Sequence, residues 1–432
     1  MFRRLTVPGL PQPPVIMRPM PEIRPFKGVR YAAEDTLKPI VCPPYDVISP
    51  EEQRRLHELD PHNAVRIELP FSDAADNVDR YRKADEQFRA WLAEGVLAVD
   101  DAPSLYVYRQ DYELPDGTRG RVAGVMGGLV LEEFGEGAGV LPHERTMPGP
   151  IEDRLALIRA CPVNISPIYA IYRGGGALAP FLDSLEHRPP EVRFADDSGT
   201  LHRMWKISAP GETEMLAGGL ADGPLVIADG HHRYETALNY HRERGGEPGG
   251  HDAVLCFCVD ADIEGLVVAA FHRAINSEEE PSAVKTRLLA EFGGKELRAD
   301  ESVNAQEASG ADHPLVFRFP DVDVLVELSA DQVTETTGER AEAWRSLDVV
   351  ALHEVVLPRL FPDGPPQMVF TRETDEVDRL IKDEGWAAGV LLRPPSATDV
   401  IDVASAGERM PQKASYFWPK AITGLVFRSL ED

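Results

Sequence analysis

The sequence predicts a mixed α/β (α+β) fold built from more than one domain. Short apolar runs typical of buried strands alternate with longer stretches of helical spacing along the chain. Hydrophobic residues make up 43% and charged residues 27% of the sequence, a balance typical of large packed cores and not of disorder. The 432 residues correspond to two or three domains, since a domain has roughly 150 residues.

The N-terminal part begins with a flexible arm and continues as an α/β block. We expect the proline-rich arm at residues 1–21 and the block at residues 22–140. Ser49 is a good N-cap and is followed by proline, so a helix is expected to start there. Residues 77–94 have an apolar stripe at helical spacing. Two alternating segments then predict a hairpin, at residues 105–112 and 121–131.

The rest of the chain divides into a core at residues 141–276 and a C-terminal α/β block at residues 282–432. In the core, a short strand at 226–228 leads into a helix from His231, and residues 253–260 form a buried strand. The C-terminal block is expected to contain helices at 284–292, 341–360 and 376–384 and strands at 315–319, 322–328 and 389–392.

The chain is strongly acidic, with a formal net charge of −27. This charge excludes non-specific binding to nucleic acid or anionic lipid, which requires a basic surface. It leaves room for a local basic pocket that binds a phosphate. An acidic host proteome is an alternative explanation for the charge.

The cysteines and the apolar runs indicate a soluble, cytoplasmic protein. Four cysteines in so long a chain form no disulfide framework, and no second cysteine pair at zinc spacing accompanies Cys256 and Cys258. Buried core thiols are therefore expected. Prolines break the first twenty residues, so we expect no signal peptide, and no apolar run reaches the length of a membrane span.

The strongest functional signal is the sequence Asp229-Gly230-His231-His232-Arg233, at the junction of a strand and a helix. A glycine at such a junction lets the backbone approach an anion, and the unpaired N–H groups of the first helical turn then point at it. Arg233 adds a charged, bidentate contact, and Asp229 can hold a divalent cation or accept a proton. These features favour a phosphate site. The alternative is that Asp229 only caps the helix and the histidines lie at the surface.

The two histidines are poorly placed to share one metal ion. Adjacent residues diverge by about 100° around a helix, so His231 and His232 point in different directions. His231 and Glu235 share a face, where an ordinary intrahelical hydrogen bond is favoured over a metal site. Contacts with different parts of a bound phosphate group suit the two histidines better.

A second signal is His143-Glu144-Arg145, which places a potential general base beside two cationic groups. Asp153 opens the helix that follows, and Asn164 precedes a strand. A solvated turn is the alternative for this loop taken alone.

The motifs together resemble a bacterial family known as domain of unknown function 1015, over about residues 24–430. The resemblance rests on Arg24-Pro25-Phe26, Pro43–Ile48, His143-Glu144, Asp153-Arg154-Leu155, Asn164–Ile168, Ala228–Ala237, Met410–Lys413 and Phe417–Lys420. The order of the motifs also resembles the core of the ParB/sulfiredoxin-like superfamily, in particular its free serine kinases. This resemblance implies a ParB/sulfiredoxin-like core with large N- and C-terminal additions. Glu144 and Asp229 are 85 positions apart, more than a minimal core needs, so we expect an insertion near residues 174–223.

The likeness to the serine kinases implies a role for each motif. It implies Glu144 as catalytic base, His232 as a further catalytic residue, and Asp229 as both a catalytic residue and a ligand of Mg²⁺ or Mn²⁺. The donor would be ATP, ADP or CTP. The residues implied to bind its phosphates are Gly230, His231, Arg233, His143 and Arg145.

Residues outside these motifs are expected to complete a substrate site. Cations held in rigid loops of so acidic a chain suggest an anion pocket. For Tyr45 and Asp46 the alternative is a structural turn. For His272 and Arg273 the alternative is a pair of surface residues. The expected substrate-binding residues are Tyr45, Asp46, Asn164, His272, Arg273, Lys413 and Lys420.

We predict an enzyme that transfers a phosphoryl group from a nucleotide to the hydroxyl group of a small molecule. The resemblance implies free L-serine as acceptor, giving O-phosphoserine. The sequence contains no Walker-A loop and no protein-kinase glycine loop. A phosphatase or nucleotide hydrolase using the same site is an alternative, and a non-catalytic nucleotide-binding regulatory protein is another. The expected partners are a small molecule and a nucleotide, not nucleic acid or a membrane, and a homodimer is compatible with the sequence.

Overall fold

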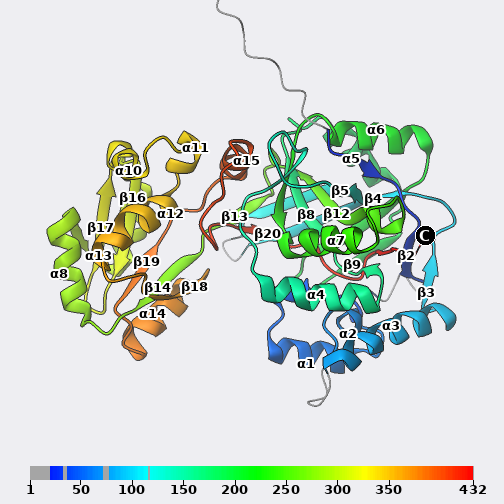
Figure 1. Cartoon of the computed structure of the whole chain (residues 1–432), viewed down its shortest axis with the longest axis horizontal. Coiled ribbons are helices and arrows are strands. Elements are labelled where there is room, and N and C mark those ends of the chain that lie inside the picture. Colours follow the sequence, from blue (N-terminus) through cyan, green and yellow to red (C-terminus); the bar gives the residue numbers. More distant parts are fainter. Residues whose placement is uncertain (1–19, 33–36, 72–76, 115–116, 432) are drawn as a thin grey trace, which may run out of the picture.

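The computed structural model describes residues 20–32, 37–71, 77–114 and 117–431, which fold into two lobes (Figure 1). The predicted mixed α/β class is confirmed. The arm expected at residues 1–21 lies almost wholly outside the described residues. Among the residues described, no helix combines the length and the apolar character needed to cross a membrane.

The larger lobe is built on a nine-stranded sheet in the order β6-β11-β8-β12-β5-β4-β10-β9, with β1 also paired to β5. The predicted hairpin is confirmed as the β4–β5 pair, and Cys256 and Cys258 are buried thiols on β12 as predicted. The strands are β1 (Ile23–Arg24), β4 (Leu105–Glu113), β5 (Arg119–Val130), β6 (Val140–Pro142), β8 (Ile168–Tyr172), β9 (Val192–Ala195), β10 (Leu201–Ile207), β11 (Leu225–Asp229) and β12 (Ala253–Asp260).

The sheet takes strands from both sides of residue 140, and the segment at 174–223 extends it. Strands β9 and β10 of that segment form one edge of the sheet beside β4. The segment therefore adds to an existing layer and does not form a separate body. The predicted domain boundaries and the ParB/sulfiredoxin-like identity of the core stay predictions.

Helices and a smaller sheet pack around the large sheet. Helices α4 and α7 pack against each other, and α7 contacts β8 and β12 (Figure 1). The predicted cap is confirmed, because Ser49 Oγ accepts a hydrogen bond from the Glu52 N–H at 3.1 Å. The small sheet has the order β3-β2-β21-β7. These elements are α1 (Pro50–Leu59), α2 (Val65–Glu68), α3 (Asn77–Ala93), α4 (Pro148–Ala160), α5 (Ala179–Ser184), α6 (Pro210–Leu220), α7 (His231–Glu243), β2 (Gly28–Tyr31), β3 (Leu97–Val99), β7 (Val163–Asn164), β21 (Phe427–Ser429) and the 3₁₀ turns η2 (Tyr45–Val47), η3 (Leu185–His187) and η4 (Gly250–Asp252).

The C-terminal lobe contains a six-stranded sheet in the order β15-β17-β16-β19-β14-β18. Its hydrophobic core includes Val316, Val377 and Leu391. The elements are β14 (His272–Asn276), β15 (Lys295–Leu297), β16 (His313–Arg318), β17 (Asp323–Leu328), β18 (Gln367–Thr371), β19 (Ala388–Leu391), α8 (Pro281–Phe292), α9 (Ala299–Glu307), α10 (Ala330–Thr337) and α14 (Thr374–Asp383).

The single helix predicted at residues 341–360 is wrong. The segment contains α11 (Glu342–Arg345), α12 (Asp348–Val350), a π-helical turn (η5, Ala351–Val356) and α13 (Leu357–Leu360). Leu347 is extended, with φ −84° and ψ 131°, and separates the first two helices. Pro358 has no N–H to continue the α-helical hydrogen bonds, and the turn before it is π-helical.

The chain crosses between the lobes twice, and the second crossing supplies part of the site. It leaves the larger lobe through β13 (Val267–Ala269) and returns through α15 (Ala397–Ser405) and β20 (Tyr416–Trp418). Strand β20 pairs with β13, and α15 contacts β6, β8 and β11 (Figure 1). The 409–420 segment, between α15 and the end of this crossing, therefore runs beside the edge of the large sheet.

Candidate functional site

The two predicted motifs meet because β6 and β11 are parallel neighbours. Leu141 lies opposite Val226, and Pro142 lies opposite Ile227. Parallel strands end at the same edge of a sheet, where ligands of α/β folds commonly bind. Residues 143–145 (the 143–145 loop) and residues 229–233 (the 229–233 loop) consequently lie side by side.

Gly230 makes the turn from β11 into α7 with a left-handed backbone, at φ 89°. An L-residue adopts this conformation only with strain. A Cβ atom at Gly230 would also lie 3.0 Å from both Arg233 Nε and Ile168 Cγ2. Glycine therefore allows the sharp turn and leaves the first N–H groups of α7 free of a side chain.

Asp229 pairs with two cations. One oxygen accepts from Arg233 Nη2 at 2.6 Å and the other from Lys420 Nζ. Burial opposes ionisation of this carboxyl group, but the charges of Lys420 and then Arg233 outweigh it and lower the pKa of Asp229 to about 2. Asp229 is therefore a carboxylate at neutral pH, although its side chain is only 12% exposed.

Asp46, on the 3₁₀ turn η2, shares this environment. Its side chain reaches solvent, yet the surrounding protein partly desolvates the carboxyl group. That desolvation and then the negative charge of Asp229 raise the pKa of Asp46. Asp46 and Asp229 therefore lie within electrostatic reach of each other.

A layer of polar residues supports Arg233 from behind. Arg233 Nη1 donates to Ser166 Oγ at 3.1 Å, and Ser166 Oγ donates to the buried Glu68 at 2.7 Å. Arg154 stacks over the Tyr45 ring at 4.3 Å. Sequence reasoning missed Glu68, which lies between Ile67 and Leu69, and gave Ser166 no role.

His143 and His232 are neutral and each forms a hydrogen bond with the backbone, His143 as donor and His232 as acceptor. His143 Nδ1 lies 2.6 Å from the Ile227 carbonyl, which can only accept, so Nδ1 carries the proton and Nε2 accepts from Ser415 Oγ at 3.1 Å. His232 Nε2 accepts from the Met147 N–H at 3.0 Å. Burial lowers the pKa of both rings, so both are neutral at pH 7.

Glu144 lies near the 229–233 loop with one oxygen free. Its Oε1 accepts from the Ala414 N–H at 3.2 Å, whereas Oε2 has no hydrogen-bond partner among the described residues. The charges of Asp46 and Glu144 raise the pKa of His232, and that of Lys413 lowers it, each by less than burial does. His232 thus lies within electrostatic reach of all three groups, and Glu144 is 19% exposed.

The 409–420 segment is bound to both loops. The Met410 N–H donates to the His143 carbonyl at 2.8 Å, and Lys420 pairs with Asp229. Lys413 has φ 55° and is the only non-glycine residue with a positive φ in the described part of the chain. Such strained backbone is concentrated at functional sites.

Three predicted substrate residues form hydrogen bonds within the protein. Asn164 is buried, and its Oδ1 accepts from the Leu255 N–H at 3.0 Å. His272 accepts from the Leu392 N–H at 3.3 Å. Arg273 is fully buried and donates to His353 Nε2 at 3.3 Å. Their predicted contact with substrate stays a prediction.

Two carboxylates fit a divalent cation that also binds phosphate oxygens. No cluster of three His, Cys, Asp or Glu side chains suited to a metal occurs within the described ranges. Mg²⁺ is commonly held by one or two carboxylates together with substrate phosphates. The mutual repulsion of Asp46 and Asp229 suits a cation between them, and Lys420 supplies part of that positive charge here.

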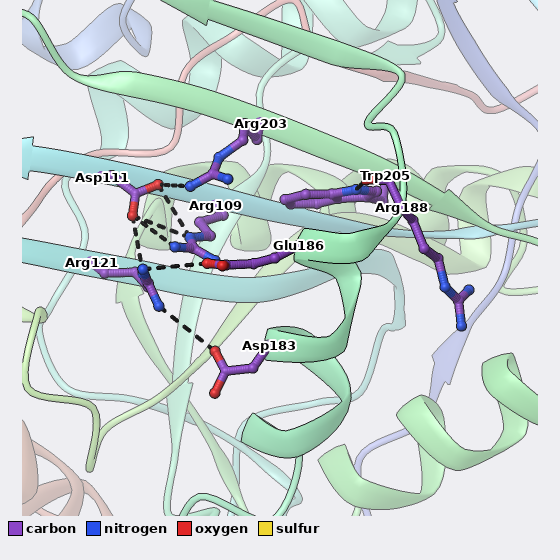
Figure 2. A network of polar contacts seen from close by, with 8 residues as sticks. All are labelled: Arg109, Asp111, Arg121, Asp183, Glu186, Arg188, Arg203 and Trp205. Carbon is purple, nitrogen blue, oxygen red and sulfur yellow. Dashed lines mark hydrogen bonds and ion pairs between the residues drawn. The ribbon is translucent and has the colours of Figure 1, made fainter.

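The largest cavity found among the described residues has a different lining. Its volume is about 850 Å³, and it lies at the β4–β5 hairpin, α5 and residues 263–265. Asp111, on its wall, accepts from Arg109 at 3.0 Å, Arg121 at 3.0 Å and Arg203 at 2.6 Å (Figure 2). None of its lining residues belongs to the two loops or to the 409–420 segment.

A sequence model of one family, described as "Protein of unknown function (DUF1015)", matches residues 23–350. The match includes both loops and ends before the 409–420 segment. No curated protein matches the chain. Among solved structures, a mutant free serine kinase in complex with ADP is 12% identical, with a TM-score of 0.36, and the alignment covers 68% of this chain and 89% of that one. SbnI with a C-terminal truncation, from Staphylococcus aureus, is 11% identical with a TM-score of 0.38, covering 70% and 86%. A conserved hypothetical protein from Pyrococcus furiosus is 13% identical with a TM-score of 0.35, covering 68% and 93%.

Proposed function

We propose that this chain, which belongs to the DUF1015 family of proteins of unknown function, is an enzyme that transfers a phosphoryl group from a nucleotide to the hydroxyl group of a small molecule. One observation carries the proposal: Glu144, whose Oε2 has no hydrogen-bond partner among the described residues, lies within electrostatic reach of His232 in the 229–233 loop. Phosphoryl transfer depends on positioning and on stabilising negative charge, and needs little more from the protein than a base and cations.

The 229–233 loop would bind the phosphates of the donor. The first N–H groups of α7 carry the positive end of the helix dipole, and Gly230 leaves them accessible. Lys420 and Arg233 add two positive charges at the same place. Asp46 and Asp229 would hold a Mg²⁺ ion, which would neutralise charge on the phosphates when bound.

Glu144 would act as the base. The Ala414 N–H holds Oε1, so Oε2 is left to accept the proton of the acceptor hydroxyl. As that proton moves to Glu144, the hydroxyl oxygen forms a bond to phosphorus and the bond from phosphorus to the nucleotide oxygen breaks. The electron pair of that bond leaves with the nucleotide. Glu144 then loses its proton to water, because its side chain is partly exposed.

We propose free L-serine as the acceptor, with O-phosphoserine as the product. An amino acid presents a carboxylate, which needs a cation near the base. Lys413 is exposed next to Ala414, and within the described residues it has no carboxylate partner. Lys413 is therefore the cation available to the acceptor, whereas Arg273 is fully buried.

A phosphorus NMR assay tests the proposal. ATP, ADP or CTP is mixed with Mg²⁺ and a panel of hydroxyl compounds that includes L-serine. We expect a new phosphomonoester signal, which Glu144→Gln lowers by about 100-fold or more because the base is lost. Glu186→Gln, which removes an exposed carboxylate of the Asp111 cluster, serves as the matched control and retains activity.

Two results of this assay would contradict the proposal. Release of inorganic phosphate alone, with every acceptor, would show a hydrolase that uses the same groups. Nucleotide binding with no turnover would show a regulatory protein. Equal activity of Glu144→Gln and the wild type would remove Glu144 from the role of base.

A further inference from the structure

Arg273 is a buried arginine without a carboxylate partner. It lies on β14, between β19 and β18 of the C-terminal sheet. Its side chain is fully buried, and within the described residues it forms no ion pair. Burial lowers its pKa to about 10, so the guanidinium group is still charged at neutral pH. A buried charge is costly unless it is hydrogen-bonded, so the three acceptors of this group decide what it does.

The three guanidinium nitrogens donate to three different segments of the chain. Nε donates to His353 Nε2 at 3.3 Å, Nη1 to the Phe271 carbonyl, and Nη2 to the Gln412 carbonyl at 3.3 Å. Burial and then the charge of Arg273 lower the pKa of His353 to about 4, so this ring is neutral at pH 7 and its Nε2 can accept. His353 belongs to the π-helical turn η5 of the C-terminal lobe. Arg273 therefore ties that lobe to the 409–420 segment.

The Gln412 carbonyl lies next to the residues that contact Glu144. Lys413 follows with φ 55°, a conformation that an L-residue adopts only with strain. Ala414 then donates its N–H to Glu144 Oε1 at 3.2 Å. Strained backbone persists only where the surrounding contacts fix it. Here Arg273 provides the contact before the strained residue, and Glu144 provides the contact after it.

We propose that Arg273 is a positioning residue for the acceptor half of the site, because it fixes the turn at residues 412–414 against Glu144. The inference rests on the proposed function, in which Glu144 is the base and Lys413 binds the acceptor carboxylate. A base must lie within hydrogen-bond reach of the proton that it accepts, and small displacements of reacting groups slow a reaction strongly. Arg273 would act through this turn without touching the substrate.

The donor half of the site does not depend on this turn. Lys420, at the other end of the 409–420 segment, pairs with Asp229. The stretch before Lys420 is held separately, because β20 pairs with β13. Arg233 also pairs with Asp229 and forms no hydrogen bond with Arg273. Loosening the turn at residues 412–414 should therefore disturb acceptor binding more than nucleotide binding.

Arg318, on β16 of the same sheet, offers a matched control. Its side chain is also buried, but Asp323 and Asp378 pair with it. None of its hydrogen bonds within the described ranges reaches the 409–420 segment. Arg318→Lys therefore perturbs a buried arginine of the C-terminal lobe without releasing the turn.

Hydrogen–deuterium exchange of the full chain without ligand measures the turn directly. Arg273→Lys keeps the charge, but an ammonium group on a flexible stem cannot replace a planar guanidinium that reaches three separate acceptors. We expect exchange at residues 412–416 to become about 10-fold faster than in the wild type, the effect of losing one charge-assisted hydrogen bond. Arg318→Lys should leave it within about twofold. His353→Ala removes one acceptor and keeps the arginine, so it should give a smaller increase and replaces Arg273→Lys if that variant does not fold.

Steady-state kinetics separate positioning from a loss of stability. In Arg273→Lys we expect the KM for L-serine to rise by about 10-fold and kcat to fall, while the KM for the nucleotide stays within about twofold of the wild type. A stability defect alone would reduce the amount of active protein and leave both KM values unchanged. Equal rises in the two KM values, or unchanged exchange at residues 412–416 in both Arg273→Lys and His353→Ala, would overturn the inference.

Failure of the inference differs from failure of the proposed function. A wild type that transfers a phosphoryl group, with an Arg273→Lys variant that changes neither the exchange nor the KM for L-serine, would keep the kinase and reject the role of Arg273. A wild type that transfers no phosphoryl group, with faster exchange at residues 412–416 in Arg273→Lys alone of the two lysine variants, would reject the kinase and support the role of Arg273 in fixing the turn.

Discussion

Two clusters of charged side chains lie in this molecule, and they differ in how well their charges are matched. In the cluster around Asp111, three arginines from β4, β5 and β10 surround one carboxylate (Figure 2). Arg109 is also paired with Glu186, and Arg121 lies 3.4 Å from the same carboxylate. Each arginine therefore has an acidic partner.

In the candidate site, positive charge lacks partners. Arg145, Arg409 and Lys413 form no ion pair within the described residues. The charge of Asp229 raises the pKa of Asp46, and the charges of Arg233 and Lys420 each lower it by less. The Asp111 cluster adjoins the largest cavity, yet its charges compensate one another. We therefore propose that unmatched charge marks the binding site, whereas the compensated charges around Asp111 form a structural network.

Replacing the central carboxylate of each cluster, Asp229 or Asp111, by asparagine should give the largest difference between the two clusters. Asp229→Asn leaves Arg233 and Lys420 without their partner in a nearly buried position. We expect phosphoryl transfer to fall by at least about 100-fold and the free energy of unfolding to fall by about 3 kcal/mol. Steady-state kinetics and urea denaturation measure the two effects.

Asp111→Asn should behave differently, because it removes only a structural contact. The Asp111 side chain is 25% exposed, so its loss is expected to lower the free energy of unfolding by about 2 kcal/mol. The kcat/KM of the folded protein should stay within about twofold of the wild type. Loss of activity in Asp111→Asn at unchanged stability would instead place the active site at the largest cavity.

Acid unfolding should reveal the Asp229 pairing through its pH range. The pKa of Asp229 is about 2 in the folded protein, below the value of about 3.9 in an unfolded chain. Its stabilising contribution is therefore complete above about pH 4 and is lost as the pH falls from about 4 to 2. In urea denaturation at a series of pH values, Asp229→Asn should flatten this part of the profile. An identical slope in the variant would show that Asp229 is not paired in solution.

The smallest effect on the free energy of unfolding is expected for substitution of Asp46, which should stabilise the folded protein. Partial desolvation and the charge of Asp229 raise the pKa of Asp46, so its ionised form destabilises the folded state above that pKa. Solvent exposure weakens the effect. Asp46→Asn should therefore raise the free energy of unfolding at pH 7 by less than about 1 kcal/mol. A lower midpoint of thermal unfolding in Asp46→Asn would show that the Asp46 carboxylate has a favourable partner, as the carboxylates of the Asp111 cluster do.

Local signals predicted the elements of the site well. The strand–glycine–helix junction at Gly230, the cap at Ser49 and the β4–β5 hairpin all depend on residues near one another in the chain. The single helix predicted at residues 341–360 failed because helical spacing continues through Leu347, whose backbone is extended, and through residues 351–356, which are π-helical.

Sequence patterns could not predict the long-range contacts of the site. The parallel pairing of β6 with β11 brings the two loops together, and nothing in either strand specifies its neighbour. Lys420 was predicted as a cation of the site, but its pairing with Asp229 depends on the path of the chain through the C-terminal lobe.

Hydrogen–deuterium exchange with and without ADP and Mg²⁺ can decide which of the two clusters binds the nucleotide, because it reports on both clusters in one experiment. We predict slower exchange on ligand binding at residues 143–147, 229–235 and 409–420. Exchange should be unchanged at residues 109–121 and 183–188, which carry the Asp111 cluster. Protection confined to the Asp111 cluster and the adjoining cavity would contradict this prediction, because the nucleotide would then bind at the Asp111 cluster.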